Sequence, residues 1–413
     1  MEVKDNKLYI GGVSAEGLAE KFDTPLYVYE EDKIRSQYRN LYDSITWPKK
    51  KILYACKANS SLAVMKVLKD EGCGIDAVSP GEVYTALKLG FKKKDILFTG
   101  NNVRDDEMKY VMGQGVLINV ESLDQLERYG KMFPKTDLAI RINPDVGAGY
   151  HGHIITGGPD SKFGIYYNRV DGAQKIAAEY GLNIIGIHSH IGSGILNPAD
   201  YINAMKMVTK TAGKFEDLEF VDFGGGIGIP YKPDEKEIDI QQFGKNVSDL
   251  FSEFCGVYGR ELTLMLEPGK YLVGQAGFLL TRVNTLKENP KHRFAGTDTG
   301  FNQLIRPSLY GAYHEIINAS SVEGEEEKIL VAGNICESGD VLTRDEHGPV
   351  DRTMSRIRRG DVLAIANAGA YGMAQACTYN SRPLPTEVMV SGGKARVIRE
   401  RGKLEDFLKG QKP

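Results

Sequence analysis

The stretch KILYACKANSSLAVMKVLKDEG (residues 51–72) contains the unit from which the fold can be inferred. Its first five residues alternate as in a half-buried strand, and the apolar residues after Ser61 recur at helical spacing. Lys57 therefore follows a strand that leads into a helix, which is where parallel α/β folds place their chemistry. A lysine there can act as an amine nucleophile in a partly dry pocket. A strand-end lysine that simply reaches solvent is the competing interpretation.

The same strand–helix unit recurs from about residue 25 to residue 275. Repeated units of this kind indicate a parallel sheet, and about eight of them predict a closed (β/α)8 TIM barrel over 25–275. A doubly wound open sheet is the alternative. The apolar runs are KILYA (51–55), DILFTG (95–100), GVLINV (115–120), DLAIRIN (137–143), NIIGIHSH (183–190), LEFVDFGGG (218–226) and LTLMLEPG (262–269), with TPLYVY (24–29) as an eighth candidate.

After residue 275 the pattern changes to short β-rich runs separated by turn residues. These runs predict an antiparallel β domain, a barrel or sandwich, over 276–413. KLYIGGV (7–13) is also strand-like, so residues 1–24 are expected to join this domain. The runs are GFLLTRVNTLKE (277–288), EKILVAGNI (327–335), DVLAIANAG (361–369), TEVMVSGG (386–393) and KARVIRER (394–401).

Composition narrows the class of protein. The 413 residues are 41% hydrophobic and 26% charged with a net charge of −3, so no basic field favours nucleic acid or an anionic membrane. No apolar run has membrane-spanning length, and the amino terminus lacks the apolar core of a signal peptide. The five cysteines are scattered without a CxxC pair, which is typical of a reducing cytoplasm.

HSHIGSG (188–194) closes one apolar run and has two interpretations. His188 and His190 are two residues apart in an extended segment, so they could share a face and bind a metal. A metal site needs further ligands, and a second HxH occurs at His151 and His153. Alternatively, one histidine stacks on a ring and the Gly-Ser turn, which contains Ser193, binds a phosphate. The segment alone leaves both open.

Two further runs end in candidate binding loops. FGGGIGIPY (223–231) has three consecutive glycines, whose N–H groups can close on an anion without obstruction by a Cβ. It matches neither GxGxxG nor a Walker motif. In LEPGKYLVG (266–274), Glu267 could be a general base or the partner of a protonated heterocyclic nitrogen, and Lys270 could pair with a phosphate or a carboxylate. Each loop could equally be an ordinary turn.

The β-rich part also contains candidate loops. CESGD (336–340) places Cys336 beside Glu337, although a lone cysteine is usually a small buried apolar residue. NAGAYGMAQACTYNSRPLP (367–385) is a long loop rich in glycine and alanine, with Tyr371 near its start.

Together, these motifs resemble those of the fold-type III pyridoxal-phosphate decarboxylases, in the same order and over nearly the whole chain. RPSLYGAYH (306–314), CESGD and YNSRP (379–383) resemble the diaminopimelate decarboxylase branch of that family. The resemblance implies an alanine racemase-like fold, with a cofactor-binding barrel and a β domain. It also implies a head-to-tail homodimer with active sites shared between the subunits. The implied ligand is a small amino-acid substrate.

The resemblance implies a role for each matching residue. Lys57 would hold pyridoxal 5'-phosphate as a Schiff base, His190 would stack on its ring and Glu267 would pair with the ring nitrogen. Cys336 would be the proton donor and would act in the neighbouring subunit's site. The phosphate and its surroundings would be bound by Ser193, Gly225, Gly226, Gly269, Lys270 and Tyr371, and the far end of the substrate by Arg306, Tyr310, Glu337, Lys270 and Tyr371.

The implied activity is decarboxylation of meso-2,6-diaminopimelate to L-lysine and CO2, the last step of lysine biosynthesis. This chain departs from the family's usual sequence at Lys270, where the family usually has arginine. Lysine keeps the positive charge but lacks the planar guanidinium that can bind an anion through two hydrogen bonds. A sibling decarboxylase acting on D-ornithine, D-lysine or a carrier-linked glutamate is therefore an alternative. A metal-dependent barrel hydrolase and a non-catalytic homologue are more distant ones. The first would leave EPGK and CESGD without a role, and the second would be expected to lack Lys57 or Cys336.

Overall fold

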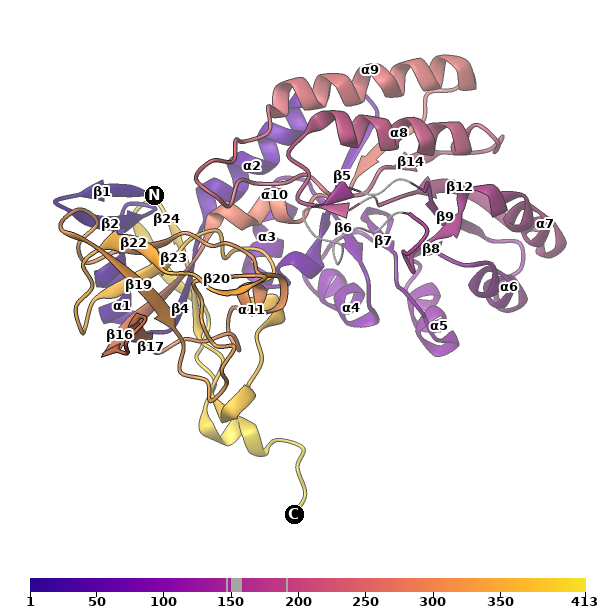
Figure 1. The fold of residues 1–413 in the computed structure, drawn as a ribbon. Coiled ribbons are helices and arrows are strands. Elements are labelled where there is room, and N and C mark those ends of the chain that lie inside the picture. Colours follow the sequence, from indigo (N-terminus) through magenta and orange to yellow (C-terminus); the bar gives the residue numbers. More distant parts are fainter. Residues whose placement is uncertain (146–147, 150–157, 191) are drawn as a thin grey trace. The chain divides into compact units, whose positions relative to one another are not determined.

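The computed structural model describes residues 1–145, 148–149, 158–190 and 192–413 (Figure 1). The chain divides into two compact units. The sheet unit comprises Met1–Ile34, Tyr231–Glu235 and Val273–Pro413, and the barrel unit comprises Arg35–Pro230 and Lys236–Leu272. Each unit is described by itself below.

The barrel unit contains a closed ring of eight parallel strands within the described residues. Closure is completed by β9, which pairs with β12 on one side and with β8 on the other, so the open-sheet alternative is wrong and the TIM barrel is confirmed. In ring order the strands are β5 (Lys50–Ala55), β6 (Gly74–Ala77), β7 (Ile96–Phe98), β8 (Leu117–Val120), β9 (Asp137–Asn143), β12 (Asn183–His188), β14 (Phe220–Asp222) and β15 (Thr263–Leu266).

The eighth barrel strand is β6, and the expectation that TPLYVY would supply it was wrong. That run forms β4 (Leu26–Glu30), which pairs antiparallel with β16 (Gly277–Glu288) and parallel with β24 (Thr386–Ser391) in the sheet unit. Alternating apolar residues predict an extended backbone, but they do not identify the strand with which it pairs. Residues 25–34 consequently belong to the sheet unit.

Helices alternate with the barrel strands and lie around the outside of the ring (Figure 1). Their starts follow capping rules, because the side chains of Ser79, Ser122 and Asp239 each accept a hydrogen bond from a first-turn N–H. The helices are α2 (Glu31–Ser44), α3 (Leu62–Asp70), α4 (Pro80–Lys88), α5 (Asp105–Gly113), α6 (Leu123–Met132), α7 (Val170–Tyr180), α8 (Pro198–Ala212) and α9 (Ile240–Tyr258).

An apolar cluster from five barrel strands fills the interior of the ring. It consists of Leu53, Leu97, Ala139, Phe220 and Met265, all nearly inaccessible to solvent. Gly186 makes room for it, because a Cβ at that position would lie 2.0 Å from the Phe220 ring. The interior is therefore packed, and the polar residues that end the strands are available for a site at the carboxyl end of the barrel.

The sheet unit has a main sheet in the order β22-β19-β17-β16-β4-β24-β25, with β23 and β18 branching from β16. Most pairings are antiparallel as expected, but β4–β24 and β17–β19 are parallel. The remaining strands are β17 (Arg293–Thr297), β18 (Ile316–Asn318), β19 (Glu326–Ala332), β22 (Arg352–Ser355), β23 (Val362–Ile365) and β25 (Lys394–Arg399).

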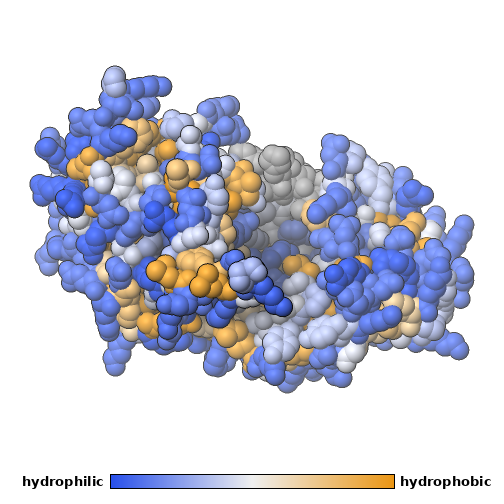
Figure 2. Space-filling view, turned by 90° about the horizontal axis from the view of Figure 1, so that it is seen from below, coloured by the Kyte–Doolittle hydropathy of each residue, from blue (hydrophilic) through white to orange (hydrophobic). Residues whose placement is uncertain are grey.

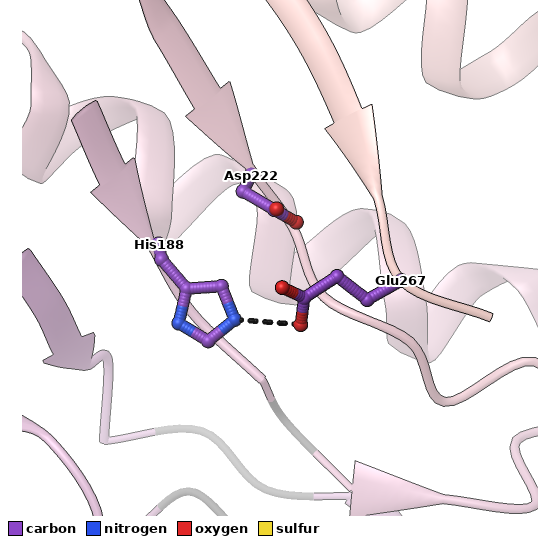
Figure 3. A group of neighbouring side chains, drawn as sticks. All are labelled: His188, Asp222 and Glu267. Carbon is purple, nitrogen blue, oxygen red and sulfur yellow. Dashed lines mark hydrogen bonds and ion pairs between the residues drawn. The ribbon is translucent and has the colours of Figure 1, made fainter. Parts of the chain in front are cut away.

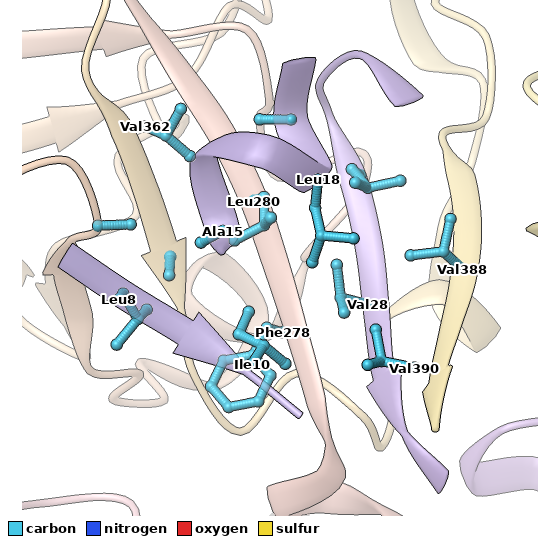
Figure 4. Packing of buried hydrophobic residues seen from close by; sticks show 14 of the residues in the cluster. Leu8, Ile10, Ala15, Leu18, Val28, Phe278, Leu280, Val362, Val388 and Val390 are labelled. Carbon is cyan, nitrogen blue, oxygen red and sulfur yellow. The ribbon is translucent and has the colours of Figure 1, made fainter. Parts of the chain in front are cut away.

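The core of the sheet unit draws on both ends of the chain. Leu8 and Ile10 of β2 (Lys7–Ile10) pack with Phe278 and Leu280 of β16, as Figure 4 shows. β2 itself lies in a separate three-stranded sheet with β1 (Glu2–Lys4) and β3 (Val13–Ser14). KLYIGGV lies in the same compact unit as β16 and contributes a small sheet of its own there.

The face drawn in Figure 2 is mostly hydrophilic, with smaller apolar patches among the polar side chains. Within the described residues, none of the helices has the length and apolar character that crossing a membrane requires. The five cysteines are free thiols, three buried and two exposed.

Candidate active site

Lys57 lies at the mouth of the barrel, in a short 3-10 turn (Cys56–Ala58) directly after β5. Its Nζ is 3.1 Å from Oδ2 of Asp76, which is on the neighbouring strand β6 and fully buried. Burial raises the pKa of Asp76, the Glu267 carboxylate raises it further, and Lys57 opposes both; the resulting pKa is about 7. The lysine amine therefore lies beside a carboxyl group that titrates near neutral pH.

Glu267 follows β15 and is buried together with the last residues of two neighbouring strands, His188 of β12 and Asp222 of β14 (Figure 3). His188 Nε2 lies 2.9 Å from Glu267 Oε2. Burial alone would raise the pKa of Glu267, but the imidazole of His188, together with the positive charge of Lys57, lowers it to about 2. Glu267 is therefore an ionised carboxylate in a water-poor site.

His190 bonds to the glycine-rich turn. Its Nδ1 accepts a hydrogen bond from the N–H of Gly225 at 3.0 Å, so Nδ1 carries no proton. Burial and the nearby positive charges of Lys57 and Arg141 hold the pKa of His190 well below its usual range. The imidazole is consequently neutral, as suits a ring that stacks on another ring.

The Gly-Ser turn and the glycine-rich turn lie side by side. The N–H of Ile195 donates to the carbonyl of Gly226 at 2.9 Å, and the N–H of Gly228 donates to the carbonyl of Ile195 at 2.9 Å. Gly226 has a φ of +108°, and a Cβ there would lie 3.0 Å from the carbonyl oxygen of Gly192. Ser193, in β13 (Gly192–Ser193), thus lies beside a backbone that only glycine can form, a suitable cradle for an anion.

EPGK packs directly against the turn that carries Lys57. The N–H of Ala55 donates to the carbonyl of Pro268 at 3.3 Å, and a Cβ at Gly269 would lie 3.0 Å from Cβ of Ala58. Lys270 begins α10 (Lys270–Val273) and is only 8% exposed. Lys270 is therefore a buried lysine that directly follows the segment packed against the Lys57 turn.

Of the two interpretations of HSHIGSG, the metal pair is not supported by the contacts of the two histidines. His188 bonds to Glu267 and His190 to Gly225, so their bonded nitrogens do not converge on one point. His151 and His153 lie outside the described residues.

The residues of the barrel unit fit pyridoxal phosphate. Oε1 of Glu267 is buried and has no hydrogen-bond partner among the described residues, which suits a carboxylate that is to accept an N–H from a ring. The glycine cradle offers backbone N–H groups to a phosphate, and Lys57 offers the amine for covalent attachment.

In the sheet unit, Arg306 is 7% exposed and begins α11 (Arg306–Tyr310). Its guanidinium lies 4.5 Å from the ring centroid of Tyr231, and its NH1 lies 3.0 Å from Nε2 of His314. The other nitrogen of His314, Nδ1, lies 2.8 Å from the carbonyl oxygen of Ala366 and must donate to it. His314 is therefore neutral, and its Nε2 accepts a hydrogen bond from Arg306. Among the described residues no carboxylate pairs with Arg306, which leaves its charge available for an anionic ligand.

The CESGD loop is held by a buried aspartate. The Asp340 carboxylate accepts the N–H of Phe301 and that of Ile335, each at 2.7 Å. Cys336 and Glu337 are exposed at the tip of the loop, where the N–H of Cys336 donates to Asn380 Oδ1 at 2.7 Å. Two exposed side chains are thus presented on a fixed backbone.

The predicted site residues fall into two sets. The barrel unit brings Lys57, His190, Ser193, Gly225, Gly226, Glu267, Gly269 and Lys270 to the mouth of the barrel, while Arg306, Tyr310, Cys336, Glu337 and Tyr371 belong to the sheet unit. Tyr371 has a φ of +56°, unusual for a tyrosine. The sequence reasoning missed Asp76 and Asp222 and considered His188 only as a metal ligand. The sequence signal that could have identified these residues is a polar residue at or near the end of an apolar strand.

A parallel barrel with a mouth formed by a lysine, a neutral histidine, a buried carboxylate and a glycine cradle defines a barrel-type pyridoxal-phosphate enzyme. The sequence model described as "Pyridoxal-dependent decarboxylase, pyridoxal binding domain" matches residues 31–274. The chain belongs to this family, among the diaminopimelate decarboxylases, as full-length relatives show.

The relatives are similar along their whole length. The diaminopimelate decarboxylase of Methanothermobacter thermautotrophicus is 48% identical, with 100% of this chain and 97% of the relative covered. That of Escherichia coli K12 is 33% identical, covering 95% and 94%. Among solved structures, diaminopimelate decarboxylase from M. jannaschii in complex with L-lysine has a TM-score of 0.90 at 35% identity, covering 100% and 98%. The Helicobacter pylori enzyme complexed with L-lysine has a TM-score of 0.87 at 34% identity, covering 95% and 98%.

Proposed function

We propose that the protein decarboxylates meso-2,6-diaminopimelate to L-lysine and CO2 with pyridoxal 5'-phosphate as cofactor. The observation that carries the proposal is its 48% identity to a diaminopimelate decarboxylase over the whole chain. Three of the similar solved structures hold L-lysine, the expected product. The reaction would complete the synthesis of lysine.

The barrel unit would hold the cofactor. Lys57 would bind it covalently, and the ionised Glu267 would accept the N–H of its ring and so keep that nitrogen protonated. The neutral His190 would stack on the ring. Ser193, Gly225, Gly226, Gly269 and Lys270 from the barrel unit, with Tyr371, would surround the phosphate. When bound, pyridoxal phosphate accepts the electron pair that remains after loss of CO2.

Cys336 would hold a proton at Sγ and return it to the substrate carbon after CO2 has left. Its exposure on a loop with a fixed backbone supports this role, because a proton donor must reach the reacting carbon from a defined position. Glu337, the next residue, would approach the same substrate.

The far end of diaminopimelate is a second amino-acid group, so the site needs both a cation and an anion there. Arg306 would bind the far carboxylate, with Tyr310 and Lys270 beside it, and Glu337 would pair with the far ammonium. The support for Arg306 is its buried guanidinium, held by Tyr231 and His314 without a carboxylate partner among the described residues. An analogue lacking either charge would leave a buried group unpaired.

We also propose a homodimer in which Cys336 and Glu337 of one subunit act in the site of the other. The support is their exposure in the sheet unit, whereas Lys57 and Glu267 belong to the barrel unit. Mixing the inactive variants Lys57→Ala and Cys336→Ala should restore about a quarter of the activity, because half of the dimers formed at random contain one complete site. Failure to restore any activity would contradict shared sites. The free thiols support a cytoplasmic location.

The function is tested by release of CO2 from meso-diaminopimelate, D-lysine, D-ornithine and L-ornithine in parallel. Only meso-diaminopimelate should react efficiently, with one L-lysine formed for each CO2. Faster release from D-lysine or D-ornithine would make the protein a sibling decarboxylase and would assign that change to the end of the site where Lys270 replaces arginine.

A further inference from the structure

Two buried carboxyl groups face one another at the mouth of the barrel (Figure 3). One ligand-type atom from each of His188, Asp222 and Glu267 lies within 4.8 Å of the others, and all three side chains are at most 3% exposed. The function proposed above uses Glu267 alone. His188 and Asp222 therefore need a separate explanation.

The contacts of the three side chains are asymmetric. His188 Nε2 is 2.9 Å from Glu267 Oε2, and Asp222 Oδ1 accepts the N–H of Gly224 at 2.8 Å. The two remaining oxygens, Asp222 Oδ2 and Glu267 Oε1, are buried and have no hydrogen-bond partner among the described residues. Two ionised carboxylates this close, both out of water, would repel one another strongly, so one of them keeps a proton.

The surroundings decide which carboxyl group is neutral. Glu267 accepts a hydrogen bond from His188 and is also stabilised as an anion by Lys57. Asp222 faces two other carboxyl groups, those of Glu267 and Asp76, and is stabilised as an anion only by the N–H of Gly224. Burial and the Glu267 charge accordingly hold the pKa of Asp222 well above its usual range. The charged and titratable groups of the described residues that face the cluster include Lys57, Asp76, Arg141, His190 and Tyr201.

We propose that His188 and Asp222 are positioning residues for Glu267, with Asp222 held as a neutral acid. The N–H of His188 fixes Oε2 of Glu267, while Asp222 adds no second negative charge and anchors the glycine turn through Gly224. The cluster then presents a single negative charge to the protonated ring nitrogen of the cofactor. This inference rests on the role proposed above for Glu267.

Asp222→Asn tests the neutral acid directly. The amide keeps an oxygen for the N–H of Gly224 and is neutral at every pH, so it should reproduce the properties of a protonated aspartate. The infrared spectra of the wild-type and Asp222→Asn holoenzymes at neutral pH should differ by the carbonyl stretch of one protonated carboxylic acid, because Asp76, whose pKa is about 7, contributes to both spectra. The dissociation constant for pyridoxal phosphate should stay within about twofold of the wild-type value. A difference spectrum without that band, or a roughly tenfold weaker cofactor complex, would mean that Asp222 is ionised and would overturn the proposal.

His188→Gln and His188→Asn form a matched pair, because both are neutral amides but only glutamine reaches the position of Nε2. The pH midpoint of the bound cofactor's visible absorption should stay near the wild-type value in His188→Gln. In His188→Asn the pH midpoint should shift and cofactor binding should be about tenfold weaker. The reason is that the charged carboxylate of Glu267 loses a hydrogen bond. Equal behaviour of the two variants would overturn the positioning role. One equivalent of tightly bound divalent metal in the purified protein would also overturn it.

These readouts do not require turnover. A protein that binds the cofactor with these signatures but does not release CO2 from diaminopimelate would contradict the proposed substrate while leaving the role of the cluster intact. A protein that decarboxylates diaminopimelate but lacks these signatures would support the proposed substrate and contradict the role of the cluster.

Discussion

Lys57 Nζ lies 3.1 Å from Oδ2 of Asp76, and the two residues come from the ends of neighbouring barrel strands. The aspartate side chain is fully buried, whereas that of the lysine is 36% exposed. The pKa of Asp76 is raised to about 7 because its burial and the charge of Glu267 outweigh the attraction of Lys57. The Lys57–Asp76 ion pair therefore stabilises the folded state by less than the burial of the charged aspartate destabilises it.

This balance predicts that Asp76→Asn stabilises the cofactor-free protein at high pH. The pKa of Asp76 is higher in the folded state than its ordinary 3.8, so the protonated form favours folding. That contribution is complete below about pH 4 and is lost as the pH rises through about 7. The variant should match the wild-type free energy of unfolding at acid pH and exceed it by up to a few kcal/mol above pH 7. Urea unfolding across this range measures the difference; a less stable variant at pH 8 would mean that the ion pair dominates.

The glycine cradle gives a second prediction. A Cβ at Gly225 would lie 2.3 Å from the carbonyl oxygen of Glu267, so Gly225→Ala should lower the free energy of unfolding by about 1–3 kcal/mol and weaken cofactor binding. Gly256 in α9 is the matched control, because nothing lies within 4 Å of a Cβ there, and Gly256→Ala should be stabilising by about 0.5–1 kcal/mol. Thermal unfolding and cofactor titration separate the two. Equal behaviour of both alanine variants would mean that the close approach at Gly225 is unimportant.

The alternation of apolar and polar residues predicted the exact bounds of two long strands, but it did not identify a short one. β9 and β16 begin and end where the alternating runs DLAIRIN and GFLLTRVNTLKE do. β6 was missed because GIDA is only four residues long and includes glycine and aspartate, both poor strand formers. β4 was recognised as a strand but assigned to the barrel, since its pairing with β16 and β24 depends on residues about 250 and 360 positions away.

The site was predictable where function imposes a motif. Lys57, the glycine turns and Glu267 stand in recognisable runs, whereas Asp76 and Asp222 are single acidic residues within apolar strands. Their importance lies in contacts with residues that are distant in the sequence, such as the facing carboxyl groups of Asp222 and Glu267. No local pattern can encode such a contact. His314 was missed for the same reason, because its partner Ala366 is on another segment.

Asp340→Asn should impair turnover without weakening cofactor binding. Asp340 accepts two backbone N–H groups, and an amide in its place can accept only with its oxygen, so one buried N–H loses its partner. The backbone that carries Cys336 then loses its fixed position, and the rate of proton return should fall. The expected result is a kcat lowered about tenfold or more with an unchanged cofactor spectrum and dissociation constant. An unchanged kcat would separate the order of this loop from catalysis.

Arg306→Lys should raise the KM for diaminopimelate by about tenfold or more. Lysine keeps the charge, but it loses the planar guanidinium that lies on Tyr231 and the hydrogen bond to His314. Cofactor binding should not change. Arg356→Lys is the control, because Arg356 is exposed and its ion pair in the described part of the chain is with the exposed Glu325. If the Arg306 variant weakened cofactor and substrate binding equally, its assignment to the far carboxylate would be wrong.

The central claim is that Lys57 at the mouth of the barrel carries the cofactor. Reducing the holoenzyme with borohydride and mapping its peptides by mass spectrometry tests this claim most directly. The account predicts that the yellow colour bleaches and that one phosphopyridoxyl group per chain is found on Lys57, in the peptide containing YACKANS. A label on Lys270 or another lysine, or a colourless protein that takes up no label, would contradict it.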